Sequence, residues 1–172
     1  MKKAILKMSA GRFDGLMAHL LPPASCREEA AFLFVKPCET GRQIAFEVIE
    51  NEKLEPADFK SQLGDYLELT DEVRARLIKR AHDLGASLVE LHSHPDPYPA
   101  AFSLADRIGL QETVPHMWWR LKKRPYFAIV VADDGFDALV WLDNPKIPQG
   151  LGGILAGDRL LRPTNNSLEG WQ

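Results

Sequence analysis

The chain contains little cysteine, two residues among 172, and this excludes a small fold held together by disulfides. Cys26 and Cys38 do not form a CxxC or other metal-ligand spacing, so we expect both to be reduced thiols with ordinary structural roles. The sequence also has no uninterrupted apolar run of about 18 residues, and no cleavage site follows its first lysines. These absences predict a soluble cytoplasmic protein with no membrane partner.

A large excess of charge of either sign is also missing. The 21 Lys and Arg residues against 24 Asp and Glu give a formal net charge of −3, which disfavours nucleic acid as a partner. With 45% hydrophobic and 26% charged residues, the composition is typical of a globular protein. No internal repeat or long linker is present, so we predict one domain over residues 1–172. Its core is expected at about 12–142, with an irregular C-terminal segment at 143–172.

The order of expected helices and strands predicts an α/β fold in which one mixed sheet is flanked by helices. Apolar residues at helical spacing predict helices at 12–21 and at 70–84, and the second has Thr70 as its N-cap and Gly85 after its end. A hairpin is expected from strands 30–35 and 43–49, with Pro37 and Gly41 in its turn. Further strands are expected at 87–94, 126–131 and 136–142, and a further helix from Ser103.

The most informative motif is E-L-H-S-H-P, at the end of the expected strand 87–94. Side chains two residues apart on a strand project from the same face, so His92 and His94 can bind one metal ion. Such a pair also occurs by chance, and a histidine on a strand is often only a half-buried polar residue. The position favours a metal site, because the strand ends here in a proline-rich loop, and α/β sheets place their sites at strand ends.

Asp106 is the candidate third ligand, in the sequence S-L-A-D that begins the expected helix. Ser103 and Asp106 also have the spacing of a helix capping box, and a carboxylate in the first turn is stabilised by the helix dipole. A helix that starts opposite the strand end would direct Asp106 back toward His92 and His94. Two histidines and one carboxylate leave one tetrahedral position open, as in catalytic zinc sites. The capping and ligand interpretations both stay open.

Hydrolysis of an amide at such a site also needs a group that moves a proton. Glu28 and Glu29 are candidates, because they directly precede the apolar run 30–35, which would lie beside the histidine strand. A glutamate at the start of a strand is otherwise an ordinary solvated residue.

Three segments together resemble the JAMM family of zinc metalloproteases, which are also called MPN or JAB domains: E-E-A-A-F-L-F at 28–34, H-S-H-P at 92–95 and S-x-x-D at 103–106. The resemblance extends over about residues 28–142, with the elements in the same order. It implies the MPN fold, with its cytidine-deaminase-like architecture, and one zinc ion per chain. Members of the family hydrolyse isopeptide or peptide bonds after the C-terminal glycine of ubiquitin and ubiquitin-like proteins.

The resemblance also implies a role for each motif residue. His92, His94 and Asp106 would bind zinc, Ser103 would donate a hydrogen bond to the oxyanion, and Glu28 would be the general acid and base. The implied partners are a ubiquitin-like protein or its conjugates, together with the E1-like and E2-like enzymes that accompany compact bacterial and archaeal members.

The chain departs from the pattern of the family in two places. Eleven residues, 95–105, separate the second histidine from the aspartate, one more than is usual. Ala31 replaces the usual glycine, and Glu29 beside Glu28 leaves a choice of acid. Since neighbouring side chains on a strand face opposite ways, only one of the two can reach the metal, and we expect it to be Glu28.

Alternatives from other functional classes also stay open. A non-catalytic MPN-like scaffold would bind a partner without cleaving it, but such scaffolds usually lack the metal ligands. A zinc hydrolase of small amides or cysteine conjugates would keep the ligands and change only the substrate. A DNA-associated relative is disfavoured by the net charge of −3.

Overall fold

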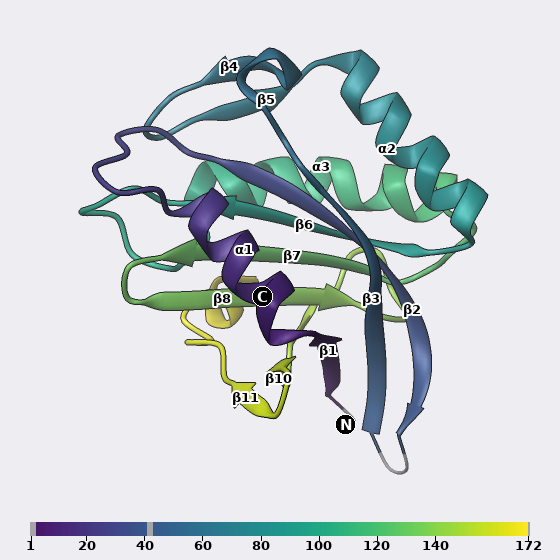
Figure 1. Cartoon of the computed structure of the whole chain (residues 1–172). Helices are drawn as coiled ribbons and strands as arrows, with labels where there is room; N and C mark the ends of the chain where they lie inside the picture. The colour runs from purple at the N-terminus through teal and green to yellow at the C-terminus, as the bar shows by residue number, and fades with distance from the viewer. Residues whose placement is uncertain (1–2, 41–42, 172) are drawn as a thin grey trace.

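The computed structural model describes residues 3–40 and 43–171, which have a mixed α/β architecture (Figure 1). Its elements are, in chain order, β1 (Ala4–Met8), α1 (Ala10–Leu20), β2 (Ala30–Thr40), β3 (Gln43–Lys53), the short 3-10 helix η1 (Pro56–Asp58), β4 (Phe59–Gln62), β5 (Leu67–Leu69), α2 (Asp71–Leu84), β6 (Ser87–Ser93), α3 (Leu104–Arg120), β7 (Tyr126–Ala132), β8 (Gly135–Trp141), β9 (Gln149–Gly150), β10 (Gly153–Ala156), β11 (Arg159–Leu161) and η2 (Leu168–Trp171).

One mixed sheet organises these elements. Its strand order is β11-β10-β1-β3-β2-β6-β7-β8-β9, and β4 pairs separately with β5. The pairs β1–β10, β1–β3 and β6–β7 are parallel, whereas β2 is antiparallel to both of its neighbours. The predicted mixed sheet flanked by helices is therefore confirmed.

The sheet is buried on both faces in its centre. Alternate residues of β2 face opposite sides, so that Phe32 and Phe34 belong to one core and Leu33 and Val35 to the other. The first core lies beneath α2 and α3, and the second lies beneath α1, where Leu16 packs. In Figure 1, α1 crosses in front of the sheet and α3 runs behind it. The end of β6 consequently lies between helical layers, where a side chain is shielded from water.

Helix α2 begins and ends where the sequence predicts. The Thr70 hydroxyl accepts a hydrogen bond from the N–H of Val73, and Gly85 has the left-handed conformation, with φ of 61°. The N–H of Gly85 donates to the carbonyls of Ala81 and His82, which would otherwise have no partner within the helix. The capping predictions for α2 are confirmed.

We expect Gly85→Ala to lower the free energy of unfolding by about 1–2 kcal/mol, the usual cost of a left-handed conformation for an L-residue. A methyl group at this position meets no atom within 4 Å, so the cost comes from the backbone and not from a clash. Urea denaturation measures it. Gly11→Ala is the control, because Gly11 lies in α1 and its methyl group would also meet no atom within 4 Å. That change should stabilise the protein by about 0.4–1 kcal/mol, and equal losses in both variants would contradict the argument.

The hairpin differs from its prediction in one respect. Strands β2 and β3 do pair, but Pro37 lies within β2, opposite Phe46, and not in the turn. Strand β6 pairs with β2 only from Ala30 to Val35, so beyond that point β2 lies at an edge of the ladder. Proline is tolerated there because no neighbouring strand requires its missing N–H. Gly41 lies outside the described residues.

Two further expectations about the chain ends are wrong. The core was expected to begin near residue 12, but β1 (Ala4–Met8) lies inside the sheet between β3 and β10. The segment 143–172 was expected to be irregular, but it contains β9, β10, β11 and η2. These strands have two to four residues each, too few for an alternation pattern to be recognised. Their pairing with neighbouring strands stabilises them instead: β10 pairs with the distant β1, β11 with β10 and β9 with β8.

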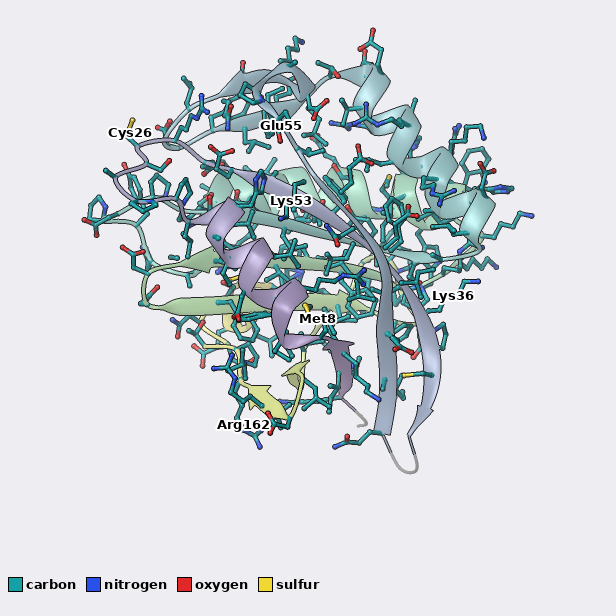
Figure 2. The ribbon with its side chains drawn as sticks, in the orientation of Figure 1. Met8, Cys26, Lys36, Lys53, Glu55 and Arg162 are labelled. Carbon is teal, nitrogen blue, oxygen red and sulfur yellow. The ribbon has the colours of Figure 1, made fainter. Side chains whose placement is uncertain are left out.

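Within the described ranges, no helix is both long and apolar enough to cross a membrane. Both cysteines are free, as the sequence predicts. Figure 2 shows Cys26 on the connection between α1 and β2, where its side chain is exposed. Cys38 is half-buried in β2.

Candidate metal centre

The pairing of β2 with β6 brings a glutamate beside the histidines. Ala30 lies opposite His92 in this antiparallel pair, so continuing the register places Glu28 opposite His94. The two segments stay paired at the end of β6 and just before β2, because the N–H of Ser93 donates to the carbonyl of Glu29 at 2.9 Å. The Ser93 hydroxyl in turn accepts from the N–H of Glu29 at 2.9 Å. Both segments therefore keep a fixed spacing at the site.

Three donor groups meet at the end of β6. The Nε2 atoms of His92 and His94 are 3.2 Å apart. Asp106 Oδ2 lies 3.2 Å from His94 Nε2, and Asp106 Oδ1 lies 3.3 Å from His92 Nε2. In a tetrahedral zinc site, bond lengths of 2.0–2.1 Å place neighbouring ligand atoms about 3.3–3.4 Å apart. The two histidines and the carboxylate thus have the chemistry and the spacing of three zinc ligands.

The ring of His94 is oriented by a carbonyl on its other side. Its Nδ1 lies 2.9 Å from the carbonyl oxygen of Pro99, which can only accept, so Nδ1 carries a proton and Nε2 is the nitrogen that faces the site. Its backbone N–H donates to the carbonyl of Val131 in β7, at 2.8 Å. His94 is only 6% exposed, although β6 ends one residue before it. This backbone and carbonyl support gives His94 a single orientation, with Nε2 facing His92 and Asp106.

Asp106 makes both the capping contacts and the histidine contacts that the sequence leaves open. The N–H of Ser103 donates to Asp106 Oδ2 at 2.8 Å, and the N–H of Asp106 donates to the Ser103 hydroxyl at 3.1 Å, which completes a capping box. The same carboxylate contacts both histidines. The eleven-residue spacing therefore does not separate Asp106 from His92 and His94. Ser103 is the N-cap of α3, and its hydroxyl accepts one bond while retaining a proton to donate.

Glu28 and Glu29 differ in what their carboxylates contact. Glu28 Oε1 lies 3.8 Å from His94 Nε2, and Glu28 is 4% exposed. Glu29 forms an ion pair with Arg27 at 3.2 Å and accepts from Gln62 Nε2 at 3.0 Å. The structure thus places Glu28, and not Glu29, beside the histidines.

One carboxylate oxygen of Glu28 and one ring nitrogen each of His92 and His94 lie within 4.8 Å of one another, which is close enough for Glu28 itself to be a metal ligand. Asp106 is nearer to both histidines, at 3.2 and 3.3 Å. We therefore assign the third ligand to Asp106 and leave Glu28 outside the ligand set.

The local electrostatics distinguish the two carboxylates. Burial raises the pKa of Glu28 to about 7, although the two histidines act in the opposite direction. Burial also acts to raise the pKa of Asp106, but hydrogen bonds with His92 and His94 outweigh it and hold that pKa well below its usual range. The pKa of His92 is raised, because its bond to Asp106 and the nearby negative charges outweigh burial. Asp106 is therefore the carboxylate that stays ionised in this cluster.

A cavity of about 360 Å³ opens beside the three donor groups. Glu28, His92 and Asp106 line it together with residues of β2, β5, β6, β7, α2 and α3 and of the loop before β5. Its wall also contains Glu90, which accepts a hydrogen bond from the Tyr126 hydroxyl. Burial raises the pKa of Glu90 and raises that of Tyr126 well above its usual value. His92, Asp106 and Glu28 therefore border a space large enough for part of a substrate.

Sequence reasoning assigned no role to two parts of this site. The Pro99 carbonyl gave no signal, because any residue supplies a carbonyl. Glu90 could have been noticed, because it lies two residues before His92 on the same face of β6.

Comparisons with known proteins add no assignment. No family model matches the chain, and no curated protein matches it significantly. The interpretation of the site therefore depends on its donor atoms, their spacing and their surroundings.

Proposed function

We propose that the chain is a zinc-dependent isopeptidase or peptidase of the MPN type, which cleaves the bond after the C-terminal glycine of a ubiquitin-like protein. The observation that carries the proposal is the triangle of His92 Nε2, His94 Nε2 and the Asp106 carboxylate, with sides of 3.2–3.3 Å and with Glu28 at 3.8 Å from His94. A zinc hydrolase needs such ligands with a proton-moving group beside them.

Each residue has a distinct part in this proposal. Zinc bound by His92, His94 and Asp106 would supply a Lewis acid that polarises the scissile carbonyl and lowers the pKa of water toward about 7. The Glu28 carboxylate accepts a proton from the attacking water and passes it to the leaving amine as the C–N bond breaks. The Ser103 hydroxyl donates to the carbonyl oxygen as negative charge develops there.

The surroundings of the site suit an extended peptide. Strand β5 (Leu67–Leu69) lines the same cavity as His92 and Asp106, and in the described sheets it pairs only with β4. An extended tail could therefore add to its other edge, with main-chain hydrogen bonds that hold the scissile bond near the metal ligands. The order of elements, with a hairpin, a helix, the histidine strand and then α3, supports the MPN fold as part of the proposal. Two free cysteines support a cytoplasmic location.

The first test is the zinc content of the purified full-length protein, measured by elemental analysis. We expect about one zinc per chain, lost after dialysis against a chelator and restored by added zinc. A folded protein that holds no zinc and cannot be reconstituted would overturn the proposal.

The second test uses a panel of ubiquitin-like proteins, each fused through its C-terminal glycine to a reporter protein. Cleavage by the zinc-loaded protein, abolished by the chelator, supports the proposed reaction. If a zinc-loaded protein cleaves none of them, the peptidase proposal fails.

The cavity favours one alternative, a zinc hydrolase of small amides or cysteine conjugates. Its volume of about 360 Å³ is within the range of small-molecule sites, about 300–1,000 Å³, and Arg74 and Glu112 on its wall offer charges of both signs. The KM values for an intact fusion and for its isolated tail peptide distinguish the two functions. A KM that rises sharply without the folded part supports a protein substrate, whereas equal values support the small-amide function.

A further inference from the structure

The residues 163–167, here called the C-terminal strap, lie against the loop that joins His94 to α3. The Ser167 hydroxyl accepts a hydrogen bond from the N–H of Phe102 at 2.8 Å. The Thr164 hydroxyl donates to the carbonyl of Ala100 at 3.2 Å. These partners are 64 and 65 residues apart in the sequence, so the contacts are specific to the folded chain. The strap therefore holds the loop at two backbone positions.

A buried carboxylate fixes the strap to the sheet. Asp137 of β8 is 1% exposed and accepts from the N–H of Asn165 at 3.0 Å and from that of Ser167 at 2.8 Å. It also accepts from the N–H of Ala138 at 2.9 Å. A buried carboxylate is costly unless hydrogen bonds satisfy it, so these donors make the attachment strong. In Figure 1 the yellow C-terminal segment returns to the sheet beside β8.

The loop held by the strap supports two of the proposed metal ligands. The carbonyl of Pro99, which orients His94 through Nδ1, precedes Ala100 directly. Phe102 directly precedes Ser103, whose N–H and hydroxyl fix Asp106 at the start of α3. A shift of the loop would consequently move the partner of His94 and the origin of the helix that carries Asp106.

The N–H of Ala100 also donates to Asp134 Oδ1 at 2.9 Å, in the turn between β7 and β8. The loop is thus held by that turn as well as by the strap.

We infer that the C-terminal strap positions His94 and Asp106 for metal binding, with Ser167 and Thr164 as positioning residues that do not themselves contact the metal. The inference rests on the proposed zinc site, but it assigns a function to a segment that follows all of the proposed site residues. Partners that orient metal ligands typically contribute about 10–100-fold in affinity. We expect the two hydroxyls of the strap together to have an effect of that size.

The experiment compares full-length wild type with the double variant Thr164→Val and Ser167→Ala, which removes both hydroxyls and keeps the backbone bonds to Asp137. Zinc dissociation constants are measured by competition with a chromogenic chelator. The matched control is Leu168→Ala, which removes packing against the core from the adjacent residue and leaves the two bonds to the loop intact. The thermal midpoint of each variant shows how much general stability has changed.

The inference predicts a dissociation constant about 10–100-fold higher in the double variant and within about twofold of wild type in Leu168→Ala. Equal affinities in the double variant and wild type would overturn it, as would equal losses in the double variant and the control.

Amide hydrogen exchange of the metal-free proteins keeps the test separate from the proposed function. If wild type binds no zinc, the proposed function fails. Faster exchange at Ser103, whose N–H donates to Asp106 and not to the strap, in the double variant than in Leu168→Ala then still supports positioning of the loop by the strap, and equal exchange contradicts it.

Discussion

Asp106→Asn is expected to weaken zinc binding by more than about 100-fold, because it removes a ligand and not merely one of the partners that orient ligands. Asparagine keeps the shape of the side chain, and its oxygen can still accept from the N–H of Ser103, as Asp106 Oδ2 does at 2.8 Å. It is neutral, however, and cannot replace the carboxylate beside His92 and His94. Chelator competition measures the change in affinity, and circular dichroism checks that α3 remains folded.

Ser103→Ala is the control that separates the two roles of Asp106. It removes the hydroxyl that accepts from the N–H of Asp106 but leaves the carboxylate between the histidines. We expect it to lower the free energy of unfolding by about 1 kcal/mol, as the loss of an N-cap usually does, and to weaken zinc binding far less than Asp106→Asn does, because the N–H of Ser103 still donates to the Asp106 carboxylate. Full zinc affinity in Asp106→Asn would show that Asp106 is a capping residue only. Glu28 would then be the alternative third ligand.

The types of residue at this site could be predicted from the sequence, because each belongs to a local motif. His92 and His94 are two residues apart on a strand, and Asp106 is three residues after the N-cap of α3. Both spacings can be recognised from the sequence without knowledge of the fold. What could not be predicted is the register of β2 against β6, which places Glu28 opposite His94. Shifting an antiparallel register by one residue moves every side chain to the other face. The resemblance to the JAMM family favours Glu28 over Glu29, but the distance of Glu28 from the histidines required the structure.

The contacts of the C-terminal strap that support the site could not be predicted for a different reason. The Ser167 hydroxyl accepts from the N–H of Phe102, and the Asp137 carboxylate accepts from the N–H of Ser167. Because any residue except proline supplies a backbone N–H, such contacts leave no recognisable pattern in the sequence. The strands around this segment are too short for alternation, so residues 143–172 carried no recognisable signal. Strand pairing, which for β10 is with the distant β1, and not local propensity, determines the structure there.

Glu28→Gln is expected to reduce the rate of amide hydrolysis by about 10²–10⁴, the usual contribution of a general acid or base, while zinc stays bound. Glutamine keeps the volume of a side chain that is 4% exposed, so packing is preserved. It cannot accept the proton of the attacking water or deliver one to the leaving amine. The value of kcat/KM for the fusion cleaved by wild type, together with the zinc content, measures the two effects separately.

Glu29→Gln is the matched control, since it makes the same chemical change one residue away. The Glu29 carboxylate contacts Arg27 and Gln62 and not the histidines, so we expect kcat/KM to stay within a few-fold of wild type.

Three results would contradict the assignment of Glu28. Wild-type activity in Glu28→Gln would exclude it as the proton carrier, and equal losses in both variants would point to a general electrostatic effect. Loss of zinc in Glu28→Gln alone would make Glu28 a ligand, despite its longer distance of 3.8 Å from His94 Nε2. The 3.2 Å distance between Asp106 and that same nitrogen is the reason we expect zinc to remain.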